Sequence, residues 1–453
     1  MMRLHCPTAL IGRDWADDVL IEADGQGRIT AVTPDVPAPA DARRAAGPVL
    51  PGMPNLHSHA FQRAMAGLAE RAGDNAADSF WTWRETMYGF LRQLGPDEVE
   101  AIAAQLYVEM LKGGYTGVAE FHYLHHDRDG SPYADRAELS HRILAAARAA
   151  GIRLTHLPVL YAHAGFGGQQ PAEGQRRFIN DVDGIRAIMD AVAAAAKDDP
   201  LVRTGLALHS LRAVTPDELN QAIVGLDSPI HIHIAEQTRE VDDCLAWCGK
   251  RPIELLTEIT ALDPRWCLIH ATHMTPAETS AVAASGAVAG LCLTTEANLG
   301  DGLFPAPDYL AAGGRFGVGS DSHIGVSASE ELRLMEYGQR LALRQRNRLR
   351  IDGPSIGAGL YRAAARGGAQ AMGVAGGEIA VGQAADLVVL DGANPKLVER
   401  RGDLILDSLV FAGDNALVRD VIVGGRLAVE DGRHRDEENI LARYRAAMAR
   451  IRS

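Results

Sequence analysis

The sequence predicts an α/β protein: a (β/α)8 TIM-type barrel with a small β-sandwich domain built from both chain termini. Between residues 49 and 325, short apolar runs alternate with longer stretches rich in alanine, leucine and glutamate, as strands alternate with helices in such barrels. Eight of these runs have the composition of strands, and polar residues gather where they end. Strand-like runs also lie near both termini. A doubly wound sheet is the alternative arrangement for the same alternation.

The composition agrees with a large globular protein. The chain has 453 residues, of which 47% are apolar and 23% charged, and this length suits a barrel with an accessory domain. A formal net charge of −13 argues against nucleic acid or an anionic membrane as a partner. Charge is screened beyond about 8 Å at physiological salt, so local arginines can still hold a small anionic substrate.

The sequence shows no pattern typical of a signal peptide, a membrane span or a disulfide framework. No long apolar segment follows Met1–Pro7, and no uninterrupted run of about 18 apolar residues could span a membrane. Five cysteines, an odd number scattered through a large chain, do not suggest a disulfide framework. We therefore expect a cytoplasmic protein without a membrane partner.

The first elements are β-strands. Asp18–Ala23 and Arg28–Val32 flank the turn residues Asp24–Gly27 and predict a hairpin. The next apolar run, from residue 49, ends in His57-Ser58-His59. Alternate residues of a strand point to the same side, so these two imidazoles can converge on one point. By itself, such a pair is more often two surface histidines in a turn than a metal site.

Seven further strands are predicted after the His57 strand. They are Gly117–Phe121, Arg153–Val159, Thr204–Leu208, Ile230–Ile234, Trp266–His270, Ala287–Cys292 and Arg315–Gly319. Helical stretches separate them, such as Asp97–Lys112 and Tyr133–Ala150, the latter followed by Gly151 as a C-cap. TIM barrels keep their chemistry at the C-terminal ends of their strands, so the polar residues there are the candidate site.

The chain returns to β structure after a helical region over about 326–372. Strand-like runs at 378–391 and 418–426 complete, with the N-terminal hairpin, one small β domain from residues 1–48 and 373–436. The barrel then occupies residues 49–372. A polar helix within 437–453 closes the chain.

The predicted strand ends supply a set of metal-binding side chains. They are His57 and His59 on the first strand, His233 and Glu236 on the fifth, His270 on the sixth and Asp321 on the eighth. Three imidazoles and a carboxylate suit a metal such as zinc, with water completing the site. Each residue alone would more often be structural, but their joint occurrence at four strand ends indicates a catalytic metal centre.

Ten motifs carry a family resemblance. Pro54–His59, His231–Glu236, the strand end at His270, Gly319–Ser322 and Gly382–Asp391 resemble the amidohydrolase superfamily, in its mononuclear deaminase branch. More narrowly, the chain resembles the formimidoylglutamate deiminases of histidine degradation, which convert N-formimino-L-glutamate and water to N-formyl-L-glutamate and ammonia. The motifs of this closer resemblance are His57–Arg63, Ser79–Arg84, Glu120–Tyr123, His209–Arg212 and Thr294–Gly302.

This resemblance implies a metal and a quaternary structure. It implies one zinc ion per chain, with Fe²⁺ or Mn²⁺ as possible replacements, and the ligands His57, His59, His233 and Asp321. Binuclear relatives carry a carbamylated lysine at the end of the fourth strand, where this chain has Leu208-His209-Ser210, so one metal is expected. The family also suggests a homodimer.

The same resemblance implies a mechanism. Zinc would lower the pKa of water to supply hydroxide for attack on the formimino carbon. Glu236 would take the proton from the water and deliver it to the leaving nitrogen, while His270 and Asp321 orient the hydroxide and stabilise the tetrahedral intermediate.

Substrate contacts also follow from the resemblance. It implies that Gln62, Arg84, Tyr123, His209 and Arg212 contact this small anionic substrate. Arg84 and Arg212 suit its two carboxylates because guanidinium groups bind carboxylates through two parallel hydrogen bonds.

Two alternatives remain open. A mononuclear amidohydrolase could instead deaminate an aromatic ring such as guanine; that pocket would need stacking faces and amide hydrogen-bonding groups, so Arg84 and Arg212 argue against it. A catalytically inactive, metal-bound binding module would be expected to lose Glu236 or a metal ligand, and the sequence retains both.

Overall fold

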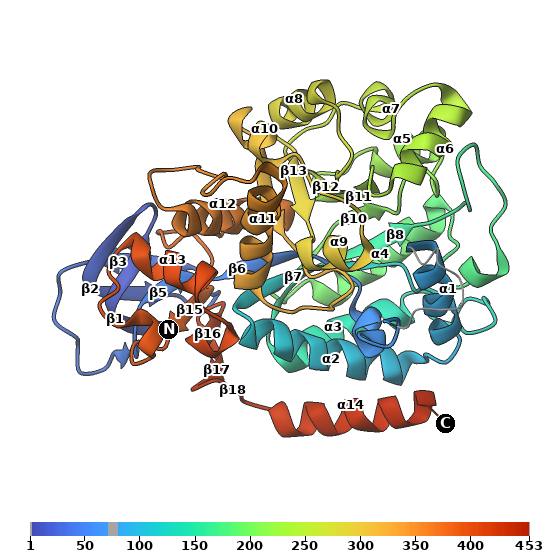
Figure 1. Cartoon of the computed structure of the whole chain (residues 1–453). Helices are drawn as coiled ribbons and strands as arrows, with labels where there is room; N and C mark the ends of the chain where they lie inside the picture. The colour runs from blue at the N-terminus through green and yellow to red at the C-terminus, as the bar shows by residue number, and fades with distance from the viewer. Residues whose placement is uncertain (1, 71–79, 453) are drawn as a thin grey trace.

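Two nine-stranded sheets organise the chain in the computed structural model, which describes residues 2–70 and 80–452 (Figure 1). The larger sheet runs in the order β6, β7, β8, β10, β11, β12, β13 and β14, with all neighbours parallel and β9 pairing with β8. These strands are β6 (Met53–Ser58), β7 (Tyr115–His122), β8 (Arg153–Leu160), β9 (Val202–Thr204), β10 (Leu206–Leu208), β11 (Ile230–Ile234), β12 (Trp266–His270), β13 (Val288–Leu291) and β14 (Arg315–Val318).

The barrel closes at the strand end that carries the paired histidines. The backbone N–H of Asp321, beyond β14, donates to the oxygen of His57 at 3.0 Å, and the N–H of His59 donates to the oxygen of Asp321 at 3.2 Å. Gly319 makes this approach possible, because a Cβ at that position would lie 2.8 Å from the His57 nitrogen. The predicted eight-stranded barrel is therefore confirmed, and its closure brings two predicted metal ligands together.

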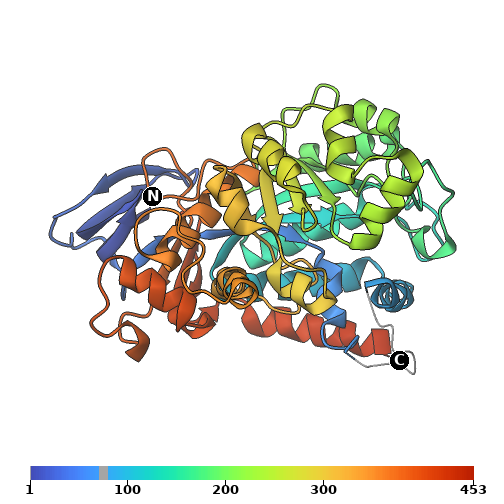
Figure 2. The ribbon, with the colours of Figure 1, turned by 45° about the horizontal axis from the view of Figure 1, so that its top comes forward.

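Helices surround the barrel strands, most of them on the outside (Figure 2). In chain order they are α1 (Phe80–Leu91), α2 (Pro96–Lys112), α3 (Glu138–Ala150), α4 (Val182–Ala196), α5 (Pro216–Ile223), α6 (Thr238–Cys248), α7 (Pro252–Ile259), α8 (Pro276–Ser285), α9 (Leu293–Leu299), α10 (Ala306–Ala311), α11 (Ala328–Leu343) and α12 (Ile356–Ala371). Of these, α1 and α9 lie at the mouth of the barrel. The helices α5 and α8 start with the same capping box, in which a threonine before the first turn accepts the N–H of a glutamate three residues on.

The helix predicted over Tyr133–Ala150 begins only at Glu138. Ahead of it, the side chain of Asp135 accepts the N–H of Ala137 at 2.9 Å, and the hydroxyl of Tyr133 lies 3.1 Å from Asp127 Oδ1. A side chain that bonds the nearby backbone in this way competes with helix formation, so this segment forms a turn. The predicted end is confirmed, because Gly151 has a φ of 73°.

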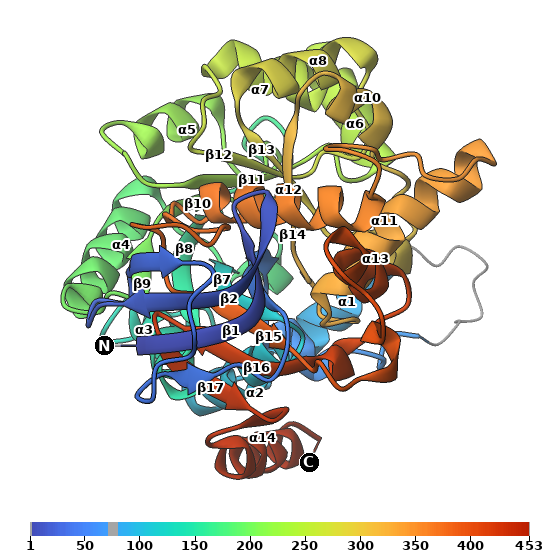
Figure 3. The same ribbon diagram turned by 90° about the vertical axis from the view of Figure 1, so that its left-hand side faces the viewer.

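The smaller sheet combines both ends of the chain, as predicted (Figure 3). Its order is β18, β17, β16, β15, β5, β1, β2 and β3, with β4 beside β1. These strands are β1 (Met2–Ile11), β2 (Asp14–Ala23), β3 (Ile29–Thr33), β4 (Arg43–Arg44), β5 (Val49–Pro51), β15 (Leu387–Leu390), β16 (Val418–Val423), β17 (Arg426–Glu430) and β18 (Arg433–His434). The predicted hairpin is the β2–β3 pair.

One strand joins the two sheets along the chain. β5 pairs in parallel with β1 and antiparallel with β15, and β6 follows it almost at once. Val49–Pro51, predicted to belong to the barrel, instead hydrogen-bond within the terminal sheet. The rest of the proposed division, at residues 372/373 and 436/437, stays a prediction.

A buried ion pair also joins the two sheets. Arg153, at the start of β8, donates from Nε and Nη2 to the two carboxylate oxygens of Asp386 at 2.6 and 3.0 Å. The same carboxylate accepts the N–H of Gly424 at 2.7 Å. The motif Gly382–Asp391 therefore fixes the terminal sheet against the base of the barrel.

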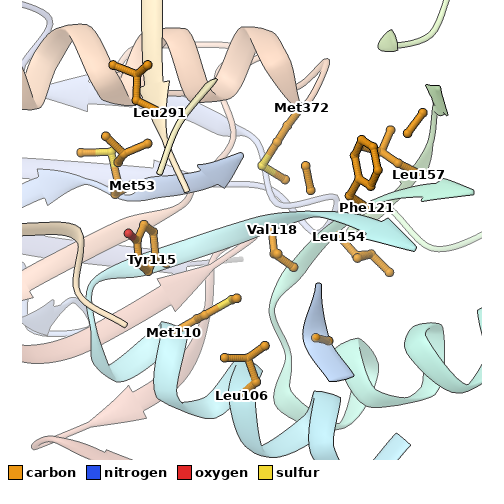
Figure 4. Packing of buried hydrophobic residues seen from close by; sticks show 14 of the residues in the cluster. Met53, Leu106, Met110, Tyr115, Val118, Phe121, Leu154, Leu157, Leu291 and Met372 are labelled. Atoms are coloured by element: carbon orange, nitrogen blue, oxygen red, sulfur yellow. The ribbon is translucent and has the colours of Figure 1, made fainter. Parts of the chain in front are cut away.

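The hydrophobic core lies between the barrel strands and their helices. Val118 points from β7 toward Leu106 and Met110 of α2 (Figure 4). Its neighbour Phe121 packs with its ring centre 5.0 Å from that of His57 and 4.4 Å from that of His233. Apolar packing thus reaches up to the predicted metal ligands.

Two further helices belong to the C-terminal part of the chain. They are α13 (Asp403–Phe411) and α14 (Glu437–Arg452), and α14 lies along α2 (Figure 1). Among residues 2–70 and 80–452, none of the helices combines the length and the apolar character that crossing a membrane requires.

Candidate metal centre and active site

Three imidazoles from opposite sides of the barrel meet at its mouth. His57 Nε2 lies 3.2 Å from His59 Nε2 and 3.0 Å from His233 Nε2. Asp321 Oδ1 lies 3.5 Å from His57 Nε2 and 3.4 Å from His59 Nε2. The closed barrel therefore converges the four predicted ligands, which come from β6, β11 and the end of β14.

The proton positions of these imidazoles test whether the group fits a metal. His59 Nδ1 lies 2.9 Å from the oxygen of Phe121, and His233 Nδ1 lies 3.0 Å from the oxygen of His209. A carbonyl only accepts hydrogen bonds, so each Nδ1 carries the proton. Burial lowers the pKa of these histidines, which keeps the rings neutral and leaves a lone pair on each Nε2.

The lone pairs of His59 and His233 both face His57 Nε2, at 3.2 and 3.0 Å, so a cation at the centre of this group could bind all three nitrogens. Carbonyls that fix the outer nitrogen of ligating histidines are a general feature of metal sites. The donor set, three imidazole nitrogens and one carboxylate oxygen, is one that zinc accepts. These residues therefore fit a metal ion.

The backbone is strained where these side chains emerge. Five non-glycine residues at the ends of β11, β12 and β14 have φ between 46° and 67°, the left-handed region that L-residues rarely adopt. They are Ala235, His270, Ala271, Asp321 and His323. Such conformations persist only where the surroundings hold them, and they cluster at functional sites. Two of these strained residues, His270 and Asp321, are predicted site residues whose side chains line the same cavity.

Two titratable groups lie beside the donor set. Glu236 Oε1 lies 3.8 Å from His270 Nε2, and that nitrogen lies 3.7 Å from Asp321 Oδ2. Burial raises the pKa of Glu236 to about 7, although His270 and Arg212 oppose this rise. Burial alone would lower the pKa of His270, but Glu236, Glu296 and Asp321 raise it to about 10. A carboxyl with a pKa near neutrality can both take and release a proton.

One cavity contains nearly all of the predicted site residues. Its walls include Gln62, Arg84, Tyr123, His209, Arg212, His233, Glu236, His270, Asp321 and His59, and about 590 Å³ of empty space lies between the walls and the open mouth. His57 lies beneath this surface and is fully buried. The cavity therefore presents donors of the metal-type set and the predicted substrate contacts on one surface.

The predicted substrate contacts differ in how they are held. Gln62 donates from Nε2 to the hydroxyl of Tyr123 at 2.8 Å. The ring of His209 lies 4.3 Å from that of Tyr161, centre to centre. Burial lowers the pKa of Arg212, but Glu240 and Glu236 more than compensate, so its pKa is raised and it stays a cation. The guanidinium of Arg84, on α1, lies 5.6 Å from the ring centre of Tyr88.

Part of the predicted Ser79–Arg84 motif cannot be placed. Ser79 lies outside the described residues, whereas Trp83 and Arg84 line the cavity. Both belong to α1.

The cavity also contains residues to which the sequence analysis assigned no role. Its walls include the aromatic side chains of Trp83, Tyr88, Tyr161 and Phe178. Only Trp83 lies in a motif that the sequence analysis identified. Beside the cavity, Glu296 Oε1 lies 3.2 Å from His270 Nδ1. A signal for Glu296 was present, because it stands in the motif Thr294–Gly302.

A second buried carboxylate supports the metal-binding strand from outside. Glu120, on β7, accepts the hydroxyl of Ser58 at 2.6 Å and the N–H of Ala60 at 2.7 Å. These two residues flank His59. A single glutamate within the apolar strand Gly117–Phe121 was the signal for it in the sequence.

Comparisons with known proteins agree with this geometry. The model of the amidohydrolase family matches residues 49–428. The chain is 58% identical over 445 residues to a formimidoylglutamate deiminase of Pseudomonas aeruginosa. The aligned region covers 97% of each of the two chains.

Two solved structures share the fold. A crystal structure of an amidohydrolase from Brucella melitensis has 48% identity and a TM-score of 0.95, and each chain is covered completely. An adenosine deaminase from Xanthomonas campestris with bound zinc has a TM-score of 0.82, covering 100% of this chain and 98% of its own. Its 23% identity establishes likeness of fold alone.

Proposed function

The chain belongs to the amidohydrolase family, and on that basis we propose that it hydrolyses N-formimino-L-glutamate to N-formyl-L-glutamate and ammonia, a step of histidine degradation. The observation that carries the proposal is the shared cavity, in which the metal-type donor set, Glu236 and two arginines face one another. The 58% identity to a formimidoylglutamate deiminase supports the same substrate.

The proposed metal is one zinc ion per chain, held by His57, His59, His233 and Asp321. Fe²⁺ and Mn²⁺ also accept imidazole and carboxylate ligands and are the alternatives. Zinc, when bound, lowers the pKa of water toward neutrality and so supplies a nucleophile at physiological pH.

Glu236 has the position and pKa of the proton carrier. Its carboxylate takes a proton from the attacking water and delivers it to the terminal nitrogen of the formimino group. Glu236 then takes the remaining hydroxyl proton as the bond between the carbon and that nitrogen breaks, so that ammonia leaves and the water oxygen becomes the formyl oxygen. His270 holds a proton at Nε2, within reach of the attacking oxygen, and Asp321 accepts on the opposite side.

Arg84 and Arg212 give the cavity its preference for a dicarboxylate. N-formimino-L-glutamate carries two carboxylates and a cationic formimino group. Two guanidinium groups in the cavity walls match the carboxylates, and the acidic residues Glu236 and Asp321 match the cationic end. Gln62, Tyr123 and His209 complete the proposed contacts.

A second candidate is deamination of an aromatic ring such as guanine. The aromatic walls formed by Trp83, Tyr88, Tyr161 and Phe178 favour it, since they offer faces on which a ring could stack. A neutral ring, however, offers no carboxylate to the guanidinium groups of Arg84 and Arg212 in the cavity walls. An inactive binding module fits less well, because Glu236 and every donor are retained.

An ammonia-release assay tests the proposal directly. Purified protein, analysed for metal in the same sample, is given N-formimino-L-glutamate or guanine, and the product is identified by mass. We expect ammonia and N-formyl-L-glutamate from the first and nothing from the second. Zinc-loaded protein that turned over guanine alone would overturn the substrate assignment, and absence of turnover with either would favour a binding module. Light scattering in the same buffer would test the homodimer that we propose from the family resemblance.

A further inference from the structure

We propose that Glu296 is a positioning residue for His270: its carboxylate holds the Nδ1 proton of the imidazole and thereby directs Nε2 at the reacting oxygen. This inference rests on the proposed function and adds a residue that acts through His270. It also assigns a role to the motif Thr294–Gly302. This motif carries part of the family resemblance, but the sequence alone suggests no role for it.

The geometry places the two nitrogens of His270 in different surroundings. Nδ1 lies 3.2 Å from Glu296 Oε1, whereas Nε2 lies 3.8 Å from Glu236 and 3.7 Å from Asp321. The ring and the Glu296 side chain are 1% and 2% exposed, so water does not compete for this contact. The hydrogen bond from Nδ1 to the carboxylate is charge-assisted. Because a rotation of the imidazole ring would break this bond, the bond fixes the orientation of the ring.

The backbone of His270 gives a reason for this support. His270 and Ala271 have φ of 67° and 48°, which are unfavourable conformations for residues with a side chain. A strained strand end keeps its geometry only where neighbouring groups fix it. The hydrogen bond from Nδ1 to Glu296 is one contact that holds this geometry, and it acts directly on the imidazole ring.

Glu296 is itself held by the helix that carries it. Its Oε1 also accepts the N–H of Cys292 at 2.8 Å, so the carboxylate caps the first turn of α9. The preceding residue, Thr295, accepts the N–H of Ser322 through its hydroxyl at 3.2 Å, next to Asp321. β13 supplies none of the four predicted metal ligands, yet the helix that follows it braces the ends of both β12 and β14.

The decisive variant is Glu296→Gln, which keeps the size of the side chain and an oxygen for the α9 cap but removes the charge. We expect kcat to fall about 10- to 100-fold, as when a residue that orients an active-site histidine is lost, with unchanged metal content. KM should change by less than about threefold, because Glu296 does not line the cavity.

Glu331→Gln is the matched control. Glu331 is buried and also bonds α9, accepting the N–H of Thr294 at 3.1 Å and its hydroxyl at 2.5 Å, and no hydrogen bond or ion pair between it and His270 occurs in the described structure. Its kcat should stay within about threefold of wild type. An equal loss in both variants would mean that α9 is merely destabilised, and would overturn the proposal.

A double-mutant cycle separates positioning from an independent effect. If Glu296 acts through His270, then adding Glu296→Gln to His270→Asn should cost nothing further, since the ring to be positioned is gone. If the fold-losses in kcat of the two single variants multiplied in the double variant, the proposal would be overturned.

A measurement without substrate keeps the test independent of the proposed reaction. In metal-loaded protein labelled with ¹⁵N-histidine, the His270 Nδ1–H should give a protected NMR signal, identified by its loss in His270→Asn. We expect it in wild type and in Glu331→Gln, and expect it to be shifted or lost in Glu296→Gln. An unchanged signal in Glu296→Gln would refute the role of Glu296, whereas a wild-type protein that releases no ammonia would refute the proposed function alone.

Discussion

The backbone oxygen of His209 lies 3.0 Å from His233 Nδ1, while the side chain of His209 lines the cavity. One residue therefore orients a predicted metal ligand through its main chain and faces the substrate through its ring. Because substitution leaves the main chain in place, the two roles can be separated by experiment.

Changing His209 to alanine should weaken substrate binding without loss of the metal. We expect KM for N-formimino-L-glutamate to rise about 10- to 100-fold, the scale of one hydrogen bond to a charged group. Metal analysis of the same sample should match wild type. Loss of the metal with the ring would show that the side chain, and not the carbonyl, supports His233.

Glu236→Gln should keep the metal and lose most of the turnover. Glutamine has the same shape but cannot carry the proton, so we expect kcat to fall by at least about 10²-fold. Steady-state kinetics with metal analysis measures both effects. Near-normal turnover would remove Glu236 from the proton-transfer role.

The pH dependence of kcat/KM should report Glu236. Its pKa is raised to about 7, and only the ionised carboxylate can accept a proton, so activity should rise as the pH increases through about 7. In Arg212→Met this rise in activity should occur at higher pH, because Arg212 is one of the groups that lower the pKa of Glu236. A rise that stays at the same pH in that variant would show that another group controls it.

Arg84→Met and Arg212→Met should each impair use of the dicarboxylate more than metal binding. We expect kcat/KM to fall by about 10- to 1,000-fold for each, since a charge-assisted bidentate contact is lost. Arg92→Met is the matched control, because Arg92 directly follows the last residue of α1 and lies outside the cavity lining. Unchanged kinetics in both variants would refute the assignment of the carboxylate contacts.

His156 should make the fold sensitive to acid. It is fully buried on β8, neither ring nitrogen has a hydrogen-bond partner among the described residues, and burial lowers its pKa to about 3. Between that value and the usual value of about 6.5, the unfolded chain binds the proton and the folded chain does not. This contribution to stability is therefore complete above about pH 6.5 and is lost as the pH falls toward 3.

His156→Leu should remove that dependence. Urea unfolding at pH 7.5 and pH 5 should show a difference in unfolding free energy that is up to about 2 kcal/mol smaller than in wild type. His126→Leu, which removes a half-buried histidine that is not among the groups acting on His156, is the control and should retain the wild-type difference. Identical pH dependence in His156→Leu and wild type would contradict the prediction.

The metal ligands could be predicted because their signals are local. His57 and His59 are one residue apart on a strand, and His233 and Glu236 follow one strand within four residues. Once the barrel was recognised from alternation, its topology placed all strand ends on one rim. The strand-end positions thus predicted which side chains converge, whereas the choice of His57, His59, His233 and Asp321 among them as metal ligands rests on the family resemblance.

The supporting contacts could not be predicted, because they depend on how distant segments face one another. The bond between Glu296 and His270 requires the direction of α9, which no periodicity reveals. Tyr88, Tyr161 and Phe178 come from α1 and two loops, where an aromatic residue is equally compatible with the core. The apolar run of Val49–Pro51 continues into β6 and so predicts a barrel strand, whereas its pairing with β1 and β15 places it in the terminal sheet.

The position of β5 has a consequence for biosynthesis. This strand precedes the one that carries His57 and His59, and its antiparallel neighbour β15 lies more than three hundred residues later in the chain. While the ribosome is still translating the second half of the sequence, β5 lacks that neighbour, and Arg153 lacks its counter-ion Asp386. The strand that carries the paired histidines therefore follows a strand that lacks this anchorage until residues 386–390 have been translated.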